Sequence, residues 1–456
     1  MCYNITGLFG GSVIMKIIVI GAVAAGTSAA AKASRNDPGA RITVYEKGEE
    51  ISYAGCILPY YVGGIAGELS SLTPRDSAFF KRRYGVDVLT RHEVTAIDRE
   101  NRRVKVRSLD TGKVFEDSYD RLIIATGAKP AGLSVAGSDA EHVFSLRNVR
   151  DAAAIKDFID KRKPKTAVII GSGPMGLEML ENLKGIDVCV VESAGHIVPA
   201  LDADMAEFLE GSLRDRGVKI LTSRRVDRIS EAGVTLDGAQ VLDAEMVLIT
   251  AGVVPDTGLA AAAGIETGIK GAIKVDDSMR TNDEYIYACG DCAETFSAIT
   301  GRPAYFPLGS TANKTGRIAG DAATGGDLRY RGSLGTGIFK VFGLTAGYTG
   351  LNERDAREQG FDAVSARISA EDKSAVFGGR PMEIKAVAQR KTGRLLGAQI
   401  IGYGGVDKRI DVFAAMITFG AKAQDLENLD LCYSPPYSTA RDPVHIAGMV
   451  LSDALR

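Results

Sequence analysis

The sequence predicts an α/β protein with two Rossmann-like dinucleotide-binding domains and a C-terminal α+β domain. Two glycine-rich turns carry this prediction, because each joins an apolar strand to a helix and such turns place a dinucleotide's diphosphate on a helix N-terminus. A third observation is the run of hairpin-like strands that begins near Leu328. A chain of 456 residues is long enough for roughly two to four domains, each with its own core.

The first glycine turn lies early in the chain. An apolar strand runs directly into Gly21-Ala22-Val23-Ala24-Ala25-Gly26, and an alanine-rich helix follows. Gly21 permits the tight turn, and Gly26 permits close approach of the helix to the strand. The middle glycine of the usual pattern is a valine, so the turn alone is a weak signal. Glu46 strengthens it, because it ends the next strand, where an acid binds ribose hydroxyl groups.

The second turn is a complete copy of the pattern. Gly171-Ser172-Gly173-Pro174-Met175-Gly176 follows an apolar strand, and Glu192 ends the next strand about twenty residues later. Each copy is followed by a further strand that ends in a glycine turn, at Thr126-Gly127 and at Ala251-Gly252. The chain therefore contains two similar halves, and we expect it to bind two dinucleotides.

One cysteine stands in an unusual stretch between these turns. Cys56 is followed by an apolar run in which Pro59 comes early, and proline is tolerated in the first turn of a helix. Cys56 should therefore lie near a helix N-terminus, where free N–H groups and the helix dipole lower the pKa of a thiol. On this interpretation Cys56 is a thiolate nucleophile. The alternative is a buried structural cysteine.

Composition and charge restrict the class of protein. The net charge of −2 gives no reason to expect nucleic acid or an acidic membrane as a partner. Six cysteines without framework spacing indicate a reducing compartment, and we expect a cytoplasmic protein. Residues 8–31 carry a single charge, but their glycines belong to the first turn, so we expect a buried strand and helix and no membrane span. Residues 1–14 lack periodicity and are expected to be an extension ahead of Met15.

The stretch Ser52-Tyr53-Ala54-Gly55-Cys56-Ile57-Leu58-Pro59-Tyr60 resembles the active-site segment of a known family, the single-cysteine FAD/NAD(P)H disulfide reductases. That family includes coenzyme A-disulfide reductases, to which the resemblance is nearest, and NADH oxidases and peroxidases. One departure is Gly55, where the family has asparagine. Larger disulfide reductases have a second cysteine at the position of Tyr61. The resemblance therefore implies that Cys56 forms its disulfide with an external thiol.

The resemblance also assigns the two cofactors. The segment from Thr281 to Asp291 resembles the family's third flavin-binding motif, in which the aspartate meets the ribityl chain of FAD. This implies that FAD binds Gly21, Gly26, Glu46, Thr126, Gly127 and Asp291. It implies that the nicotinamide nucleotide binds Gly171, Gly173, Gly176 and Glu192. The expected domains are an FAD-binding domain split over 15–125 and 251–327, an NAD-binding domain at 126–250 and a dimerisation domain at 328–456.

Two smaller expectations concern the same segments. Glu192 would accept hydrogen bonds from ribose hydroxyls and repel a 2′-phosphate, and no arginine follows in Ser193-Ala194-Gly195, so NADH is expected and NADPH is less favoured. Cys289 and Cys292 have the spacing of a redox pair or half a zinc site, but no second pair of ligands exists. We expect them to be small packing residues beside the flavin.

The resemblance implies further residues for substrate. Tyr433, in Tyr433-Ser434-Pro435-Pro436-Tyr437, matches a tyrosine that the partner subunit contributes near the cysteine. Family contacts to coenzyme A are matched by Lys32, Arg35, Ser52, Asn313 and Arg441. Cations at these positions suit a ligand that carries phosphates. The alternative is that they are ordinary solvated charges.

The expected activity is flavin-dependent reduction of a coenzyme A-linked disulfide or persulfide by NADH, through a mixed disulfide on Cys56 in a homodimer. An NADH oxidase or peroxidase with a Cys56 sulfenic acid is the alternative, but Ala24 stands where those enzymes carry a histidine. An electron-transfer or redox-sensing flavoprotein would not need Cys56. Two departures remain: Ala375-Val376-Phe377-Gly378 replaces the family's Tyr-Tyr-Pro-Gly, and Pro174 replaces an aromatic residue that covers the nicotinamide face.

Overall fold

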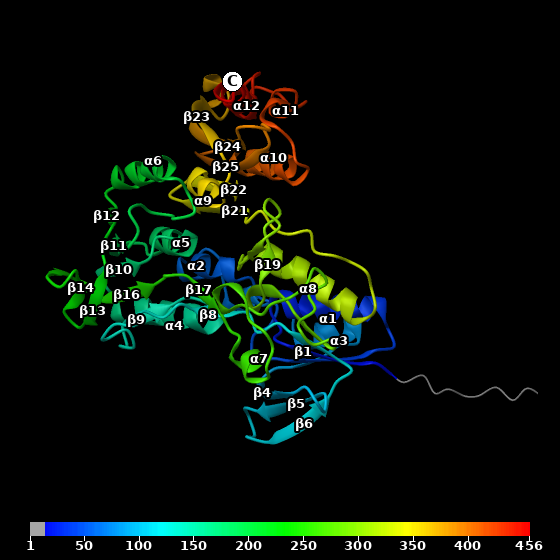
Figure 1. Cartoon of the computed structure of the whole chain (residues 1–456). Helices are drawn as coiled ribbons and strands as arrows, with labels where there is room; N and C mark the ends of the chain where they lie inside the picture. Colours follow the sequence, from blue (N-terminus) through cyan, green and yellow to red (C-terminus); the bar gives the residue numbers. More distant parts are fainter. Residues whose placement is uncertain (1–13) are drawn as a thin grey trace, which may run out of the picture.

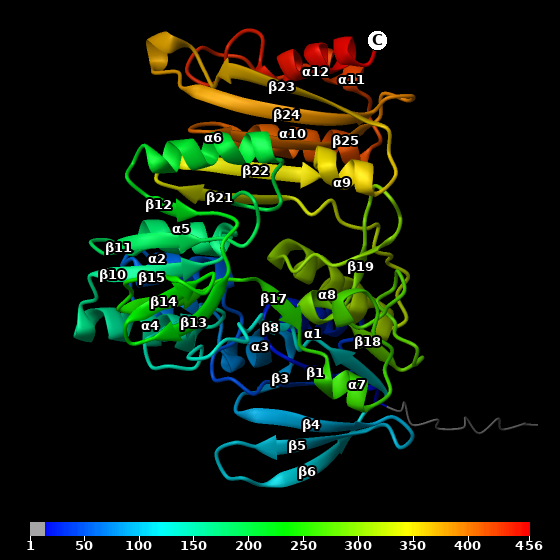
Figure 2. The same cartoon turned by 60° about the vertical axis from the view of Figure 1, so that its left-hand side comes forward.

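The structure, a computed structural model, describes residues 14–456, so the expected extension at 1–14 lies almost entirely outside the described residues. Figures 1 and 2 show three parts. The blue N-terminal segment and a later yellow-green segment form one part, the green middle of the chain forms a second, and the orange and red C-terminal segment forms the third.

The first part is built on a parallel sheet of five strands in the order β18-β7-β1-β2-β3. Its strands are β1 (Lys16–Ile20), β2 (Arg41–Tyr45), β3 (Asp87–Leu89), β7 (Arg121–Ile124) and β18 (Ile286–Ala288). The chain leaves this sheet after β7 and returns to it with β18, far along the sequence. The central strands are apolar and buried because helices cover the sheet, as parallel sheets require.

Two helices of the first part pack unusually closely. They are α1 (Ala24–Asn36), which follows β1, and α8 (Gly309–Ala323), which follows β18. The alanines of α1 are mostly buried, and a side chain at Gly316 would meet the carbonyl oxygen of Ala25 at 2.3 Å. The small residues therefore explain why the alanine-rich helix predicted after the first turn packs where it does. The other helices of this part are α3 (Ser77–Tyr84) and α7 (Gly258–Ala262), while α2 (Leu58–Val62) buries its apolar side chains in the core of the second part.

The second part repeats the plan. Its parallel sheet has the order β12-β11-β10-β16-β9. The strands are β9 (Val143–Ser145), β10 (Thr166–Ile170), β11 (Asp187–Val191), β12 (Lys219–Leu221) and β16 (Met246–Ile249), and the helices are α4 (Val149–Arg162), α5 (Pro174–Asn182) and α6 (Ala203–Arg214). Each part also carries an antiparallel three-stranded sheet. These consist of β4 (His92–Asp98), β5 (Arg103–Ser108) and β6 (Val114–Ser118), and of β13 (Val226–Ser230), β14 (Gly233–Leu236) and β15 (Gln240–Leu242).

The two parts are joined where their repeats end. The short strands β8 (Ala128–Pro130) and β17 (Val253–Pro255) follow the glycine turns after β7 and β16, and they pair antiparallel with each other. The chain therefore passes from one part to the other at equivalent points of the two repeats, and it does so in both directions through this pair of strands. A further small pair, β19 (Thr295–Phe296) with β20 (Pro303–Ala304), lies ahead of α8.

The third part is an antiparallel sheet of five strands in the order β21-β22-β25-β24-β23. Its elements are β21 (Gly337–Val341), β22 (Leu344–Gly350), α9 (Glu353–Glu358), β23 (Ala363–Glu371), β24 (Pro381–Gln389), β25 (Leu395–Gly402), α10 (Val406–Thr418), α11 (Ala423–Glu427) and α12 (Pro443–Ala454). In the sequence, the stretch after the last strand shows two helical segments. Three are present, because α11 is too short to show a helical period.

A buried lysine ties the third part to the second. The Lys385 ammonium on β24 lies 2.9 Å from carboxylate oxygens of both Asp204 and Glu353, and 3.2 Å from one of Asp202. Three carboxylates around one cation compensate the cost of burying its charge. This contact holds the C-terminal sheet against the start of α6.

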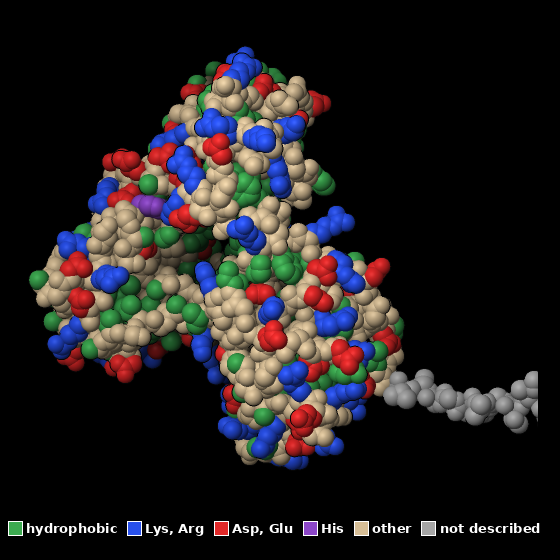
Figure 3. Space-filling model, viewed as in Figure 1, with side chains coloured by type: hydrophobic (Ala, Val, Ile, Leu, Met, Phe, Trp, Pro, Cys, Tyr) green, Lys and Arg blue, Asp and Glu red, His purple; other side chains and the backbone are tan. Residues whose placement is uncertain are grey.

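The architecture confirms the predicted fold class: two parallel α/β units of the Rossmann type and a C-terminal α+β unit. The exact boundaries at 125, 250 and 327 stay a prediction. Within residues 14–456, every helix is too short or too polar to cross a membrane. On the face shown in Figure 3, acidic and basic side chains are interspersed over all three parts.

Candidate active site

The first glycine turn has the geometry of a phosphate-binding turn. Gly21 adopts φ +102°, and a side chain at Gly26 would lie 1.9 Å from the Gly21 carbonyl oxygen, so only glycine fits at that contact. The Glu46 carboxylate accepts hydrogen bonds from the backbone N–H of Ala22 at 2.8 Å and of Gly48 at 2.7 Å. The acid is therefore fixed beside the turn, with acceptor capacity left on both oxygens.

The second turn reproduces this geometry. Gly171 also adopts φ +102°, and a side chain at Gly176 would lie 2.4 Å from the Gly171 carbonyl oxygen. Glu192 accepts hydrogen bonds from the Ser172 N–H at 3.0 Å, the Ser172 hydroxyl at 2.6 Å and the Ala194 N–H at 2.8 Å. Although burial opposes ionisation, these hydrogen bonds lower the pKa of Glu192, so it is a carboxylate at neutral pH.

Both turns fit a dinucleotide. The helices α1 and α5 begin without a side-chain cap and without an acidic residue in the first turn. Their first N–H groups therefore lack an acid that would compete with a ligand's phosphates, and the helix dipole favours an anion there. Gly173 is the N-cap of α5 and leaves the space in front of the helix open.

The remaining residues expected to bind FAD are Thr126, Gly127 and Asp291. Thr126 donates its hydroxyl hydrogen bond to the carbonyl of Asp256 at 2.6 Å, and Gly127 follows in a turn with φ +72°. Asp291 is paired with Arg147, whose Nη2 lies 2.8 Å from Oδ2. Sequence reasoning missed Arg147, because it belongs to no motif and lies 144 residues from its partner.

Cys56 lies beside the first turn. The Ser52 N–H donates to the Ala22 carbonyl at 2.9 Å, which holds the start of the stretch against the turn. Cys56 itself is in the 3₁₀ turn Gly55–Ile57, immediately before α2, with Pro59 in the first turn of that helix. Its thiol is free and its surface is exposed. The predicted position at a helix N-terminus is therefore what the chain adopts.

The predicted lowering of the Cys56 pKa is wrong for the protein chain on its own. Partial burial raises the pKa of the thiol, and the nearby Glu178 carboxylate raises it further. The backbone N–H and Arg147 lower it, but less. The helix dipole contributes little because α2 has only five residues.

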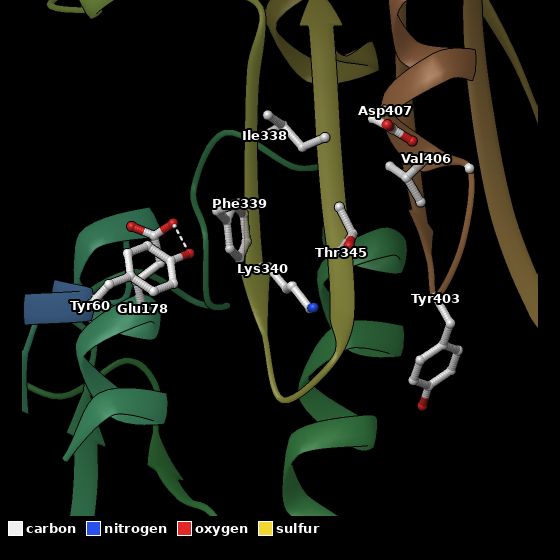
Figure 4. A pocket seen from close by; sticks show the side chains of 10 residues that line it. Tyr60, Glu178, Ile338, Phe339, Lys340, Thr345, Tyr403, Val406 and Asp407 are labelled. Carbon is white, nitrogen blue, oxygen red and sulfur yellow. Dashed lines mark hydrogen bonds between the residues drawn. The ribbon is translucent and has the colours of Figure 1, made fainter. Parts of the chain in front are cut away.

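Glu178 belongs to a pair that sequence reasoning also missed. The Tyr60 hydroxyl lies 3.4 Å from its carboxylate, at the edge of a cavity of about 420 Å³. Figure 4 shows this pair on α2 and α5, facing β21 and β22 across the cavity. Burial raises the pKa of Glu178 to about 7, and burial together with Glu178 raises that of Tyr60 to about 12. Two groups with displaced pKa values beside a thiol mark a candidate functional site.

Four of the five predicted substrate contacts lie in the first part. The Lys32 ammonium is paired with Asp321 at 3.0 Å, and Asn313 donates to the Ser28 hydroxyl at 2.9 Å. Arg35 is exposed, with its guanidinium 5.7 Å from the Tyr84 ring centre. Ser52 adopts φ +54°, a strained value for serine.

The fifth contact, Arg441, and the predicted catalytic residue Tyr433 lie apart from Cys56 within one chain. Tyr433 is exposed, with 56% of its surface accessible, and Arg441 is exposed on the same segment between α11 and α12. Figure 2 shows α11 and α12 at one end of the molecule and α2, which follows Cys56, in its middle. The structure therefore does not bring Tyr433 and Cys56 of one subunit together.

The two cysteines of the C-x-x-C spacing lie in a hydrophobic core. Cys289 and Cys292 are fully buried in the core of the first part, and both thiols are free. The residues from 14 onward contain no group of three potential metal ligands. Their burial agrees with the expectation that they are small packing residues.

Most of the chain matches the models of one known protein family. Residues 15–314 match the family model described as pyridine nucleotide-disulphide oxidoreductase, and residues 337–444 match its dimerisation domain. A Methanocaldococcus jannaschii protein named NADH oxidase is 34% identical over 97% of this chain and 99% of its own length. A Pyrococcus furiosus protein named NAD(P)H sulfur oxidoreductase (CoA-dependent) is 35% identical over 96% of this chain and 99% of its own.

Solved structures agree with this placement. The NAD-dependent persulfide reductase from A. fulgidus superposes with a TM-score of 0.93 at 40% identity, covering 96% of this chain and 83% of that one. Reduced CoADR-RHD from Bacillus anthracis gives 0.95 at 36% identity, over 97% and 81%. The family uses FAD and a nicotinamide nucleotide, which agrees with the two turns. The chain is therefore a member of the pyridine nucleotide-disulphide oxidoreductases, with that family's dimerisation domain at its C-terminal end.

Proposed function

We propose that this protein reduces a coenzyme A-linked disulfide or persulfide with NADH, as an FAD-containing homodimer in the cytoplasm. The observation that carries the proposal is Cys56: its thiol is free and exposed beside the first dinucleotide turn. The cysteines at 189, 289 and 292 are buried in other places, and Cys432 lies on the C-terminal part. A nucleophilic thiol without a neighbouring partner needs an external sulfur to complete its cycle.

The reaction balances in two steps. The Cys56 thiolate attacks one sulfur of coenzyme A disulfide, forms a mixed disulfide and releases one coenzyme A thiolate. Two electrons and one proton from NADH, with one further proton, then reduce the mixed disulfide to the Cys56 thiol and a second coenzyme A thiol. With coenzyme A persulfide the products are coenzyme A and hydrogen sulfide. When bound, FAD supplies the two-electron relay between the nicotinamide and the sulfur.

The protein's own residues bind the substrate and handle protons. Arg35 and Arg441 are exposed cations, and we assign them to the phosphates of coenzyme A. Lys32, Ser52 and Asn313 complete this predicted set, although the Asp321 pair reduces the charge that Lys32 offers. Tyr433 of the partner subunit is the proposed proton donor to the leaving thiolate, which is consistent with its exposure on the dimerisation domain.

The names of the relatives support this substrate class. The Pyrococcus furiosus relative is named as a CoA-dependent sulfur oxidoreductase, and the A. fulgidus structure as a persulfide reductase. The segment Ala375–Phe377 lacks the second tyrosine that the family's active-site segment carries. We therefore propose that coenzyme A persulfide, which needs less room, is turned over faster than coenzyme A disulfide.

NADH is the proposed electron donor. Glu192 is buried, ionised and beside the second turn, where a 2′-phosphate would be repelled. Arg224 approaches this position, since its N–H donates to the Glu192 carbonyl, but its guanidinium is paired with Asp237 at 2.7 Å. This pairing makes Arg224 less available to a 2′-phosphate, which supports NADH.

An NADH oxidase is the second candidate, because the Methanocaldococcus jannaschii relative carries that name. It would pass the electrons to oxygen through a Cys56 sulfenic acid. Ala24, at the first turn of α1, argues against it, since it offers no acid–base group there.

One assay separates the two candidates. NADH oxidation is followed without oxygen, with coenzyme A persulfide or coenzyme A disulfide as acceptor, and then with oxygen alone. The proposal expects turnover with the sulfur acceptors that disappears in Cys56→Ser. No turnover with either, together with fast NADH consumption in oxygen, would establish the oxidase.

A further inference from the structure

The segment that carries Tyr433 has little structure of its own. Residues 428–442, between α11 and α12, form neither helix nor strand. Six consecutive residues, 432–437, are exposed. Its internal hydrogen bonds include those from the Tyr437 and Ser438 N–H groups to the Ser434 carbonyl. A loop of this kind takes its shape from what holds its ends.

Its end is held by one buried arginine. Arg409, on α10, is 1% exposed and is the largest fully buried side chain among the described residues. Its Nε and Nη2 donate to both carboxylate oxygens of Asp442, at 2.9–3.2 Å. Nη2 also lies 3.3 Å from the hydroxyl of Ser438, which itself donates to Asp442 at 2.6 Å. The exposed residues 432–437 are therefore followed by two buried residues, Ser438 and Asp442, to which Arg409 is hydrogen-bonded.

The same arginine holds a second loop. Nη2 of Arg409 donates to the Asp372 carbonyl at 2.9 Å. Asp372 closes the loop between β23 and β24, because its carboxylate accepts from the Arg380 N–H at 2.9 Å. This loop exposes Val376 and Phe377, the residues that replace the family's second tyrosine segment. One guanidinium thus joins the bases of both loops.

The arginine cannot be replaced without cost. Burial opposes the ionisation of Asp442, but hydrogen bonds from Arg409 and Ser438 lower the pKa of Asp442, so the pair is charged at neutral pH. A bidentate arginine–carboxylate pair fixes orientation as well as distance. A lysine would keep the charge but lose the fork that reaches Asp442, Ser438 and Asp372 at once.

We propose that Arg409 is a positioning residue for the substrate site: it sets the shape of the 428–442 loop and the 372–380 loop, and thereby the placement of Tyr433 and Arg441 against the partner subunit's Cys56. The inference rests on the proposed function, which gives Tyr433 and Arg441 their roles. Arg409 itself touches neither substrate nor cofactor.

The test compares two activities of the FAD-loaded dimer. One is anaerobic NADH oxidation with coenzyme A persulfide, and the other is NADH-dependent ferricyanide reduction, which takes electrons from the flavin without the loops. Arg409→Lys and Arg409→Met should lower kcat/KM for the persulfide by about 10- to 100-fold, as small misplacements of reacting groups do. Ferricyanide reduction should stay within about twofold, since Arg409 contacts no part of the dinucleotide sites.

A matched control is Arg367→Met. Arg367 is paired with Glu383 at 2.9 Å in the same sheet but contacts neither loop. It should leave both activities within about twofold. Amide hydrogen exchange of residues 428–442 supplies a readout independent of activity, and exchange should speed up in the Arg409 variants alone.

The results that would contradict the proposed role of Arg409 can be named in advance. Full persulfide turnover in Arg409→Met, equal loss of both activities, or unchanged exchange of the loop would overturn the positioning role. If Tyr433→Phe and Arg441→Ala both keep wild-type persulfide kinetics, the proposed substrate site fails instead. Faster exchange in the Arg409 variants would then still support its hold on the loop.

Discussion

The two glycine turns have the same backbone and different surroundings. In each, the N–H of the first glycine donates to the last residue of the next strand at 2.8 Å, and an acid after that strand binds the N–H of the following residue. The acids differ in burial: Glu192 is 7% exposed and takes an additional serine hydroxyl, while Glu46 is half-buried. The two turns therefore share one backbone arrangement, and it suits the diphosphate of a dinucleotide.

The clearest difference lies one turn into each helix. Counted from the first glycine of each turn, Ser28 of α1 and Glu178 of α5 occupy the same position. Ser28 accepts a hydrogen bond from Asn313 of α8, which closes the first helix against its neighbour. Glu178 instead points at Tyr60, four residues after Cys56.

The different surroundings suit the two glycine turns to different tasks. The first turn is packed under α8 and suits a cofactor that stays bound. The helix after the second turn instead carries Glu178, whose titratable carboxyl lines a cavity near Cys56, so we expect a nucleotide that binds and leaves during turnover. The shared fold predicts that each turn binds a dinucleotide. The side chains around each turn predict how long that dinucleotide stays bound and what chemistry takes place there.

The largest expected effect distinguishes the two turns directly. Gly26→Val should abolish FAD binding, because a side chain there meets the Gly21 carbonyl at 1.9 Å. Gly176→Val should keep the flavin but remove its reduction by NADH, because the clash is confined to the second sheet. Flavin absorbance per chain and stopped-flow reduction by NADH are the measurements. Loss of flavin in both variants, or in neither, would remove the distinction.

The next effect concerns the acids. Glu192→Ala should lower kcat/KM for NADH by about 10- to 100-fold, since a charge-assisted hydrogen bond contributes about 1.5–3 kcal/mol. The value for NADPH should rise or stay unchanged, because the repulsion of its phosphate is removed. Steady-state kinetics with both nucleotides decide it. An NADPH preference in the unmodified enzyme would contradict the assignment of Glu192.

The site could be predicted only where it is local in sequence. Gly21, Gly171 and their acids lie within short strand–turn–helix units, so their spacing made them candidates, and the structure gives them the expected backbone geometry. Arg147 with Asp291 and Tyr60 with Glu178 are separated by 144 and 118 residues, and only packing brings them together. The error about the Cys56 pKa has the same origin, since the helix position was visible in the sequence, while the partial burial of the thiol and the nearby Glu178 carboxylate were not.

A smaller effect should follow from removing that carboxylate. The pKa of Glu178 is about 7, so Glu178 becomes an anion as the pH rises through neutrality and opposes ionisation of Cys56. Glu178→Gln should therefore move the pH midpoint of Cys56 alkylation by iodoacetamide to lower pH. Glu181→Gln, on the same helix, is the control and should move it less. A shift to higher pH in Glu178→Gln would show that the carboxylate acts differently.

The smallest effect is on stability. Because the pKa of Glu178 is raised in the folded protein from 4.5 to about 7, the folded state binds more protons than the unfolded state between these values, and stability falls as the pH rises through this window. Glu178→Gln should thus gain about 1 kcal/mol near pH 8, a figure reduced for solvent screening, and nothing near pH 4. Thermal unfolding at the two pH values measures it. Equal gains at both would point to packing rather than charge.

The central claim is that Cys56 carries the substrate's sulfur as a mixed disulfide, and mass spectrometry of the non-reduced enzyme tests it most directly. The FAD-loaded protein is incubated with coenzyme A disulfide, digested without reductant and analysed before and after anaerobic addition of NADH. We expect a coenzyme A adduct on the peptide that contains Cys56, which NADH removes and which Cys56→Ser does not form. An adduct confined to Cys432, or one on Cys56 that NADH leaves in place, would contradict it.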